Sequence, residues 1–483
     1  MRVRTAKWDE DALYLQFLQR DRVHDGKFLT GVISTGIYCL PSCPARRPKR
    51  ENVRFFHDPA EARSSGLRPC YRCRPDSFYR GEEFHESLFE QTAARVRTGP
   101  AAFHDIARIA RAAGLSRTAL NDLFREHTQE SPGAFLRRVR VESVCQSLEK
   151  GAKAADAAAS AGFESASAFH EQFSARTGLT PAAYASLGRA RQFTLRLPAG
   201  YRTREVLDFF GRDKESVSER VHASGFSKCF AFNDRAILVD VAFQGNTAVC
   251  SADTQYSHEA HRAIVRMLGL DSDAASFERQ FAGDELLGGL LQRQQGLRIP
   301  LTPEPWEALG WAIIRQQISL KAAVALRRGL IARLGLLHNS GLRAFPTARA
   351  VAETDVETLR QLKFSASKAE YLLAAARAVA SGDVPLHKLR ELSAHHAARM
   401  LSAIRGVGPW TVQYVFLRGA GFADCLPAGD AGLARGLAQL AGQRPDESAI
   451  KELLGRFAPF RSLAACHVWA SLSTDSKDKN HDD

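Results

Sequence analysis

Two pairs of closely spaced cysteines constrain residues 1–80 more strongly than any other feature of the chain. Cys39 and Cys43 form a C-x3-C pair, and after 26 further residues Cys70 and Cys73 form a C-x2-C pair. Four thiolates in two close pairs suit tetrahedral zinc. In a reducing compartment such clusters are more often metal ligands or nucleophiles than disulfides. The pattern predicts a small zinc domain, and the spacing fits a purely structural zinc site as well as a reactive one.

Basic residues surround the cysteines, and the chain as a whole has a formal net charge of +13. Those between and beside the two pairs include Arg46, Arg47, Lys49, Arg50, Arg68, Arg72 and Arg74. A fixed positive field beside a zinc thiolate would hold a phosphate backbone against it. Zinc also keeps the sulfur deprotonated and nucleophilic at neutral pH. These features favour a reactive site that faces DNA.

The segments Thr35–Cys43, Ala45–Val53 and Arg68–Cys73 resemble the N-terminal domain of the Ada adaptive-response regulator. The resemblance implies that Cys39 accepts a methyl group irreversibly from a methylphosphotriester in DNA. It further implies that Cys43, Cys70 and Cys73 are the other ligands of Zn2+. Methylation would turn an anionic thiolate into a neutral thioether and so strengthen binding to phosphate. The DNA contacts expected in this domain are Arg46, Arg47, Lys49, Arg50 and Arg72.

One departure from that family lies near the other end of the chain. The Ada regulator usually ends in a second methyltransferase domain with a Pro-Cys-His-Arg site, and this chain has no such tetrapeptide. The run Ala465-Cys466-His467-Val468 matches it only superficially and lies in an apolar helical segment. We therefore interpret Cys466 as a core residue.

An internal repeat occupies the helical region of residues 85–188. The segment Ala113–Phe135 recurs as Ala161–Tyr184, and each copy has a glycine in a short turn between two helical stretches. This pattern is typical of a helix-turn-helix unit, whose second helix can lie in the major groove. The candidate recognition helices are Arg117–Glu126 and Ala166–Ala175. A plain helical bundle would also have glycine turns, but next to the cysteine domain the pair resembles an AraC-type regulatory domain.

The segment Leu401–Tyr414 predicts a helix, a Gly-x-Gly hairpin at Gly406 and Gly408, and a second helix. Backbone N–H groups at such a helix N-terminus bind phosphate without sequence preference. About twenty residues beyond the hairpin, Asp430 follows a loop that contains proline. This combination resembles the helix-hairpin-helix DNA glycosylases, most closely the AlkA-type 3-methyladenine glycosylases. Further matching segments are Ile313–Ser319, Arg461–Trp469 and the strand-like runs of residues 190–290, which look like the small α/β subdomain of that family.

The resemblance implies that Asp430 is the catalytic carboxylate. Cleavage of an N-glycosidic bond develops positive charge on the sugar, which a fixed carboxylate stabilises; the alternative is that Asp430 only caps the next helix. Bifunctional members of the superfamily carry a lysine at the position of Trp410 and form a Schiff base with the sugar. Because tryptophan cannot do so, we expect a monofunctional enzyme that leaves an abasic site.

The target base must leave the stack to reach its pocket. Aromatic faces attract cationic alkylated purines, and the resemblance implies that Tyr414, Trp469 and Trp410 form this pocket, although ordinary core packing would also explain them. Gln317 falls where the family can place a wedge in the vacated stack. Together with the glycines of the hairpin, it is an expected DNA contact.

The sequence thus predicts a multidomain α+β protein for DNA-alkylation repair. The expected parts are a zinc methyl-acceptor domain (1–82), an all-α tandem helix-turn-helix domain (83–189), a small α/β subdomain (190–298), an all-α helix-hairpin-helix glycosylase domain (299–474) and a disordered tail (475–483). Two alternatives are a methylation-responsive regulator whose C-terminal half only binds DNA, and a structural zinc module on a repair enzyme.

The expected partners are double-stranded DNA, both alkylated and promoter sites, and RNA polymerase. No stretch approaches the ~18 apolar residues of a membrane span, and the first residues lack the apolar core of a signal peptide. We therefore expect a cytoplasmic protein that does not associate with membranes. We also expect a monomer.

Overall fold

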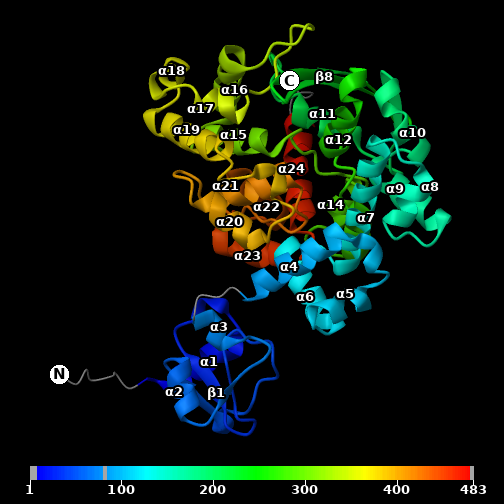
Figure 1. Ribbon diagram of the computed structural model, residues 1–483. Helices are drawn as coiled ribbons and strands as arrows, with labels where there is room; N and C mark the ends of the chain where they lie inside the picture. Colours follow the sequence, from blue (N-terminus) through cyan, green and yellow to red (C-terminus); the bar gives the residue numbers. More distant parts are fainter. Residues whose placement is uncertain (1–7, 80–83, 479–483) are drawn as a thin grey trace. The chain divides into compact units, whose positions relative to one another are not determined.

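The computed structural model describes residues 8–79 and 84–478, and the chain divides into two compact units, Met1–Gln91 and Thr92–Asp483 (Figure 1). The multidomain α+β class predicted from the sequence is confirmed. Among the described residues, no helix is long and apolar enough to cross a membrane.

The first unit is built on a four-stranded sheet of order β3-β1-β2-β4. The pairs β1–β2 and β1–β3 are antiparallel, whereas β2 and β4 are parallel. Leu29, Tyr38, Phe56 and Leu67 form part of a small apolar core beneath the sheet. The elements are α1 (Glu10–Gln19), β1 (Leu29–Val32), β2 (Ile37–Cys39), β3 (Val53–Phe56), α2 (Pro59–Ser64), β4 (Arg68–Pro69) and α3 (Pro75–Tyr79), followed by α4 (Phe84–Thr98), within which the boundary between the units falls.

The second unit opens with the two predicted helix-turn-helix copies, joined by the long helix α7. Equivalent serines, Ser116 and Ser165, cap the second helix of each copy, and equivalent glycines, Gly114 and Gly162, adopt positive φ just before it. The predicted recognition helices are therefore present, each two residues longer than expected. The elements are α5 (Ile106–Ala113), α6 (Arg117–Thr128), α7 (Pro132–Glu149), α8 (Ala154–Ser160), α9 (Ala166–Thr177) and α10 (Pro181–Ala185).

The next part is an antiparallel sheet of order β5-β9-β8-β7-β6 with helices packed beside it. Val239 and Val241 of β8 are fully buried, as the alternation of apolar residues along the strand predicts. The elements are β5 (Gln192–Arg196), α11 (Thr203–Phe210), β6 (Glu219–His222), β7 (Gly225–Phe232), β8 (Arg235–Gln244), β9 (Thr247–Ala252), α12 (Ser257–Met267), α13 (Ala274–Phe281) and α14 (Gly288–Arg293).

The remaining part is helical, and its core is the largest apolar cluster of the molecule. In Figure 1, α24 (red) runs between α22 and the green α/β part. The elements are α15 (Pro305–Arg315), α16 (Leu320–Leu334), α17 (Ala348–Ala352), α18 (Val356–Gln361), α19 (Ala366–Ala380), α20 (Ala394–Ser402), α21 (Pro409–Tyr414), the π-helix η7 (Val415–Ala420), α22 (Ala431–Ala441), α23 (Glu447–Gly455) and α24 (Arg461–Asp478); the short 3-10 turns are η1 (Arg22–His24), η2 (Arg50–Asn52), η3 (Pro100–Ala102), η4 (Leu187–Arg189), η5 (Thr254–Tyr256) and η6 (Leu386–Lys388).

The tail expected from residue 475 overlaps the end of α24, whose backbone is helical to Asp478. The rest of the predicted tail, residues 479–483, lies outside the described residues.

The parts of the second unit share cores and charge networks. Phe173 and Tyr184 of the helix-turn-helix part belong to the same apolar cluster as Leu195 and Val239 of the sheet. His261 of α12 also bonds the carbonyl oxygen of Thr177, at 2.7 Å. We infer that these two parts fold as one body.

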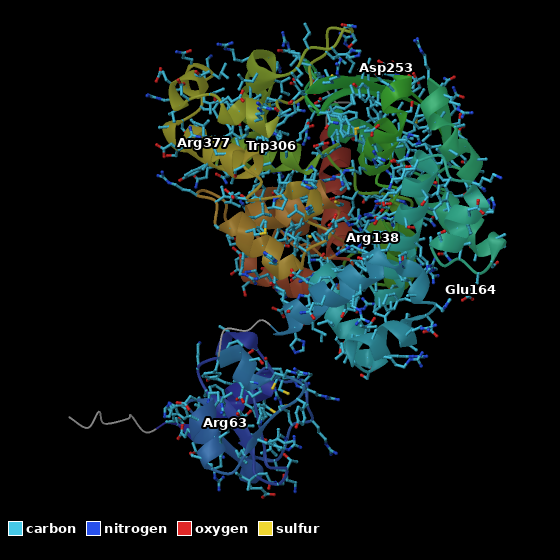
Figure 2. The ribbon with its side chains drawn as sticks, in the orientation of Figure 1. Arg63, Arg138, Glu164, Asp253, Trp306 and Arg377 are labelled. Atoms are coloured by element: carbon cyan, nitrogen blue, oxygen red, sulfur yellow. The ribbon has the colours of Figure 1, made fainter. Side chains whose placement is uncertain are left out.

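A second contact joins the helix-turn-helix part to the C-terminal helical part. Buried Arg138 of α7 (Figure 2) bonds Glu130 at 3.1 Å, and Glu130 in turn pairs with Arg390 at 2.8 Å. Burial alone would raise the pKa of Glu130, but the two arginines outweigh it and hold the pKa at about 2. His127 of α6 lies 2.8 Å from Ser393, the residue that caps α20.

Lys228 anchors a buried four-charge network where the sheet meets the helices. Its ammonium lies 3.0 Å from Glu219 on the neighbouring strand and 2.9 Å from Glu307 on α15. Arg327 of α16 bonds the same two carboxylates at 2.9 and 2.7 Å. Two positive and two negative charges thus balance one another where little water can reach them.

Candidate metal centre and active site

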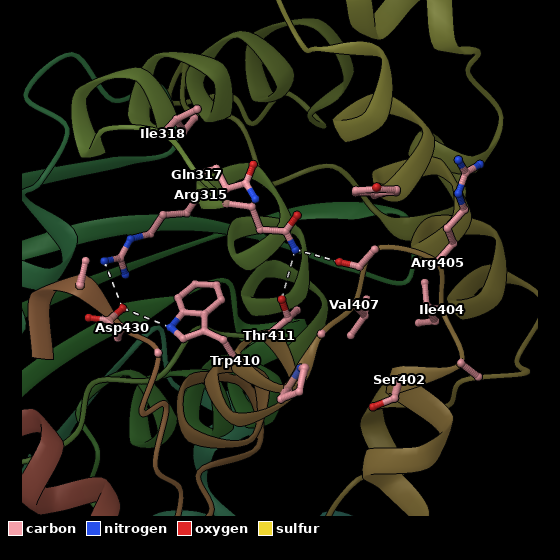
Figure 3. Close-up of a pocket in the computed structure, with 18 of the residues that line it drawn as sticks. Arg315, Gln317, Ile318, Ser402, Ile404, Arg405, Val407, Trp410, Thr411 and Asp430 are labelled. Carbon is pink, nitrogen blue, oxygen red and sulfur yellow. Dashed lines mark hydrogen bonds and ion pairs between the residues drawn. The ribbon is translucent and has the colours of Figure 1, made fainter. Parts of the chain in front are cut away.

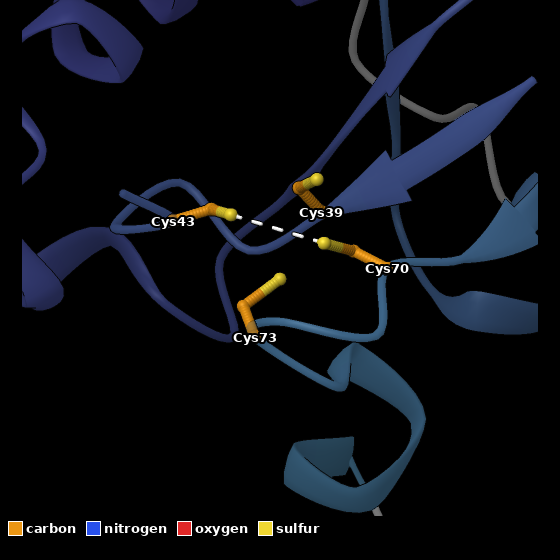
Figure 4. Close-up of side chains that lie close together, drawn as sticks. All are labelled: Cys39, Cys43, Cys70 and Cys73. Carbon is orange, nitrogen blue, oxygen red and sulfur yellow. Dashed lines mark hydrogen bonds between the residues drawn. The ribbon is translucent and has the colours of Figure 1, made fainter. Parts of the chain in front are cut away.

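The first unit gathers the four cysteines because of how its strands pair. In the parallel pair β2–β4, Tyr38 lies opposite Pro69, so Cys39 and Cys70 end up side by side. Cys43 lies in the turn after β2, and Cys73 lies just before α3. The four sulfurs lie within 4.8 Å of one another, with 4.0 Å between Cys43 Sγ and Cys70 Sγ (Figure 4).

This cluster fits a zinc ion. Tetrahedral zinc with Zn–S bonds of about 2.3 Å needs sulfurs roughly 3.8 Å apart, close to the observed spacing. Hydrogen bonding with Cys43 raises the pKa of Cys39, while hydrogen bonding with Cys39 lowers the pKa of both Cys43 and Cys70. A divalent cation would end this competition for protons by holding all four sulfurs as thiolates.

The four sulfurs differ in their backbone contacts. The amide of Leu40 donates to Cys73 Sγ at 3.3 Å. Because an amide donor withdraws charge from a thiolate, this contact makes the Cys73 sulfur less nucleophilic.

The basic residues predicted to contact DNA in this unit lie in different surroundings. Arg47 stacks on the ring of Phe17 at 3.9 Å, and Arg50 is ion-paired at 2.9 and 3.1 Å with two acidic residues of α1. Both therefore already stabilise the fold of the unit. Three of the predicted contacts are exposed, namely Arg46, Lys49 and Arg72.

The two candidate recognition helices differ in charge. Helix α6 exposes Arg117 and Arg125. In α9, Arg176 is held by Asp271 at 3.2 Å, and the exposed residues at the start of that helix, such as Ser167, are uncharged. Helix α6 therefore presents more positive charge to a phosphate backbone than α9 does.

Asp430 lies at the N-terminus of α22 and is only 3% exposed. Its Oδ1 accepts hydrogen bonds from the Leu433 amide at 2.9 Å and from Trp469 Nε1 at 3.0 Å. Its Oδ2 accepts from Trp410 Nε1 at 3.2 Å and lies 3.4 Å from Arg315 (Figure 3). The carboxylate therefore caps the helix and is also fixed toward a cleft, so the two interpretations of its role are compatible.

The hairpin before α21 is held by a close packing contact. Gly406 has a φ of +86°, and a Cβ there would come within 2.2 Å of the Tyr371 ring, whereas a Cβ on Gly408 would meet open space. Gln316 donates to the Gly406 carbonyl at 2.9 Å and to Thr411 at 3.2 Å, which ties the loop after α15 to the hairpin (Figure 3).

A cleft of about 900 Å³ joins these parts and is lined by the hairpin, the loop after α15 and Asp430. Gln317 lies exposed at its edge with a φ of +55°, as its expected role at the DNA surface requires. Leu320, the first residue of α16, is also well exposed, and it was not singled out from the sequence. No lysine lines this cleft or the neighbouring cavity among the described residues.

A second, smaller cavity of about 300 Å³ shares Arg315 with the cleft. Two of the predicted pocket aromatics line it, Tyr414 and Trp469, whereas Trp410 lines the cleft and stacks on Tyr414 at 5.3 Å. Cys466 also touches this cavity, but it is buried in the apolar cluster, as expected of a core residue.

Sequence reasoning missed most of the charged lining of this cavity. It comes from segments far apart in the chain, and no local pattern marks it. The charged residues are Arg212, Arg298 and Arg418, from the loop after α11, the loop before α15 and the π-helix η7, and Phe209 of α11 lies beside them.

Four family models match successive parts of the chain. They are the metal binding domain of Ada (residues 12–76), a helix-turn-helix domain (109–186), the AlkA N-terminal domain (192–304) and the HhH-GPD superfamily of base excision DNA repair proteins (311–459). The metal-binding match and the clustered sulfurs together confirm the prediction of a zinc centre.

Known proteins resemble either the whole chain or its halves. A probable bifunctional transcriptional activator/DNA repair enzyme AlkA of Mycobacterium tuberculosis is 27% identical over 96% of this chain and 97% of its own length. The bifunctional transcriptional activator/DNA repair enzyme Ada of Escherichia coli is 30% identical over 35% of this chain and 48% of its own. The 3-methyladenine DNA glycosylase structure from Archaeoglobus fulgidus matches with a TM-score of 0.52 and 25% identity, over 58% of this chain and 97% of that one.

Proposed function

We propose which residues carry out each function of this chain, which fuses an Ada-type zinc domain and regulator to an AlkA-type helix-hairpin-helix glycosylase. The chain is a bifunctional DNA repair enzyme and regulator that binds DNA and zinc. Asp430 serves base excision, Cys39 accepts methyl groups from methylphosphotriesters, and the helix-turn-helix copies bind promoter DNA.

The fixed carboxylate of Asp430 is the observation that supports excision best. Two indole N–H groups and an arginine hold it at the edge of the cleft. As the C1′–N bond of an alkylated purine breaks, positive charge develops on the sugar, and this carboxylate stabilises it while water adds its oxygen to C1′. Because no described residue that lines the cleft or the smaller cavity is a lysine, we expect an abasic site as the product rather than a cleaved strand.

An oligonucleotide with one alkylated purine, incubated with protein and then treated with hot alkali, tests this proposal. We expect strand cleavage only after alkali, and loss of that cleavage in Asp430→Asn. Cleavage without alkali would overturn the monofunctional assignment. Asparagine still caps a helix well, so a variant that melts like the wild type yet forms no abasic sites separates catalysis from capping.

The absence of abasic sites on any alkylated base would instead favour a regulator whose second half only binds DNA. In that case the wild type and Asp430→Asn would bind a duplex equally and leave every base in place. An intact carboxylate with three donors argues against this alternative.

The match to the metal binding domain of Ada supports Cys39 as the acceptor. The Leu40 amide also withdraws charge from the Cys73 sulfur, which weakens Cys73 as a competing nucleophile. Mass spectrometry after incubation with methylphosphotriester DNA should find a single +14 Da adduct on the peptide that contains Cys39. A methyl group on Cys73 in place of Cys39 would refute this assignment.

The regulatory part of the proposal includes RNA polymerase as a partner and a monomeric state. Exposed arginines on α6 support promoter binding. Methylated protein should bind its promoter more tightly than unmethylated protein. In Arg117→Ala, the affinity for DNA should depend less steeply on salt concentration than in the wild type. Co-sedimentation with polymerase on promoter DNA, and light scattering of the free protein, would test the other two points.

A further inference from the structure

Gln129 connects the helix-turn-helix part to the segment that carries Asp430. It is the residue that caps the end of α6, and its Oε1 accepts a hydrogen bond from the backbone N–H of Asp424 at 2.7 Å. The thiol of Cys425 lies 3.7 Å from the same oxygen. Asp424 and Cys425 belong to the segment 424–430, which lies between η7 and α22 and ends at Asp430. A side chain of the helix-turn-helix part thus contacts the segment that holds the candidate catalytic carboxylate.

Three successive amides of the segment 424–430 are bonded by side chains from three different elements. The N–H groups of residues 424, 425 and 426 donate in turn to Gln129, to Ser462 at 2.9 Å and to Gln413 at 2.9 Å. These residues are outside any helix or strand, so the three side chains supply the partners that an element would otherwise provide. Ser462 belongs to α24 and Gln413 to α21, the two helices whose tryptophans donate to Asp430.

Asp424 also restrains the start of α24. Its carboxylate accepts two hydrogen bonds from the guanidinium of Arg461, each at 2.7 Å, and one from the Arg461 amide at 3.2 Å. Arg461 is the first residue of α24. Pairs of this kind between arginine and carboxylate fix geometry as well as charge. A shift of Asp424 would therefore displace both the segment that leads to Asp430 and the helix that carries Trp469.

The second helix-turn-helix copy has a glycine at the position that corresponds to Gln129. Gln129 has a φ of +61°, and Gly178, which ends α9, has a φ of +69°. Glycine adopts this conformation without steric cost, whereas a residue with a Cβ is strained. Strained residues that their surroundings hold in place tend to lie at functional positions. The first copy thus carries a side chain where the helix end alone favours glycine, and that side chain reaches Asp424.

The residues on either side of Gln129 are fixed to the C-terminal helical part. His127 lies 2.8 Å from Ser393, and Glu130 pairs with Arg390 at 2.8 Å. A side chain can position a catalytic group only if it is itself held in place. These two contacts hold the end of α6, so Gln129 meets the segment 424–430 from a fixed position.

We propose that Gln129 is a positioning residue for base excision, so that the helix-turn-helix part completes the scaffold of the site around Asp430. Gln129 lines neither the cleft nor the smaller cavity, and it acts through the segment 424–430. Reaction rates depend steeply on such placement, since a displacement of about 1 Å can cost about 10²-fold. The inference rests on the proposed glycosylase function and adds to it a residue from outside the glycosylase part.

Gln129→Met tests the proposal, because methionine has a side chain of similar length but offers only a weak sulfur acceptor. The protein is used in excess over a duplex that contains one alkylated purine. At saturation, the rate of abasic-site formation should fall about tenfold or more. The dissociation constant for the same duplex should stay close to the wild-type value, because the change affects the placement of Asp430 rather than the DNA surface.

Hydrogen exchange provides a readout that does not depend on activity. In Gln129→Met, the amides of a peptide that covers residues 422–430 should exchange faster, because the Asp424 amide has lost its acceptor. Peptides from β7 and β8 should exchange as in the wild type. A variant that is destabilised as a whole would instead show faster exchange in all of these peptides.

Gln146→Met is the matched control, because it makes the same chemical change at an exposed position of α7. Its excision rate and its exchange should equal those of the wild type. Should Gln129→Met fail to fold, Gln129→Gly removes the same acceptor and suits the positive φ of this position. It should fold and still lose the excision rate.

Two results with an active wild type would overturn the inference alone. One is a wild-type excision rate in Gln129→Met, and the other is a lower rate without faster exchange in residues 422–430, which would refute the route through Asp424. A wild type that removes no alkylated base would refute the proposed glycosylase function and this inference with it.

Discussion

Replacing Lys228 by methionine tests the buried network between the sheet and the helices. Lys228 is fully buried and donates to Ser218 at 2.9 Å, to Glu219 at 3.0 Å and to Glu307 at 2.9 Å. Without it, two buried carboxylates share one cation, Arg327. Removing one partner of a buried ion pair costs about 3–5 kcal/mol. That is a large share of the roughly 5–15 kcal/mol by which a typical protein is stable.

Urea denaturation at pH 7, followed by tryptophan fluorescence, measures this loss as a shift of the midpoint at constant slope. The double variant Lys228→Met/Glu307→Gln is the control, because it restores the balance of one cation and one carboxylate. It should regain part of the lost stability, with a coupling energy of about 1–3 kcal/mol. A loss below about 1 kcal/mol in the single variant, or no recovery in the double, would refute the reasoning.

The network also predicts a dependence on pH. Burial alone would raise the pKa of Glu219 and of Glu307, but Arg327 and Lys228 outweigh it and hold both below their usual value. A carboxyl whose pKa is lowered by folding adds stability above its unfolded pKa, and this stability is lost as the pH falls. Without Lys228 the carboxyl groups take up protons more readily, so the destabilisation should be smaller at pH 5 than at pH 7.

The structure predicts the outcomes of three further changes. Gly406→Ala should lower the free energy of unfolding by about 2 kcal/mol or more, through positive φ and the collision with Tyr371, whereas Gly408→Ala should leave the urea midpoint nearly unchanged. Burial lowers the pKa of His261 to about 4, so the free energy of unfolding should fall by about 3 kcal/mol as the pH falls from 6.5 to 4. In His261→Gln, a plot of this free energy against pH should be flatter over the same range. An unchanged plot would contradict the assignment to His261. Removing zinc with a chelator should unfold Met1–Gln91 in circular dichroism while the Thr92–Asp483 melt stays in place; a melt that shifts as a whole would show the units to be coupled.

The sequence predicted the elements that local chemistry controls. Spacing located the zinc ligands, and the repeated glycines and serines located α6 and α9, because turns and caps are set by neighbouring residues. Asp430 was found because it follows the hairpin at a recognisable distance. Its neighbours Trp410 and Trp469 were expected as aromatic surfaces, and only the fold reveals that both donate to the carboxylate.

The arginines of the 300 Å³ cavity beside Asp430 could not be predicted in this way. Arg212 and Arg418 are about two hundred residues apart, and neither belongs to a motif. They meet on Phe209 only because the α/β part packs against the π-helix η7. Sequence patterns report which residues lie on one face of an element, but not which distant faces meet. For the same reason the Lys228 network, which joins four elements, left no sign in the sequence.

The packing of α6 against α20 has a consequence for how the protein works along a chromosome. Because His127 touches the cap of α20, and α20 leads into the hairpin, the candidate recognition helix α6 and the cleft beside Asp430 belong to one compact unit. A DNA duplex that binds α6 would therefore be held at a set offset and angle from that cleft.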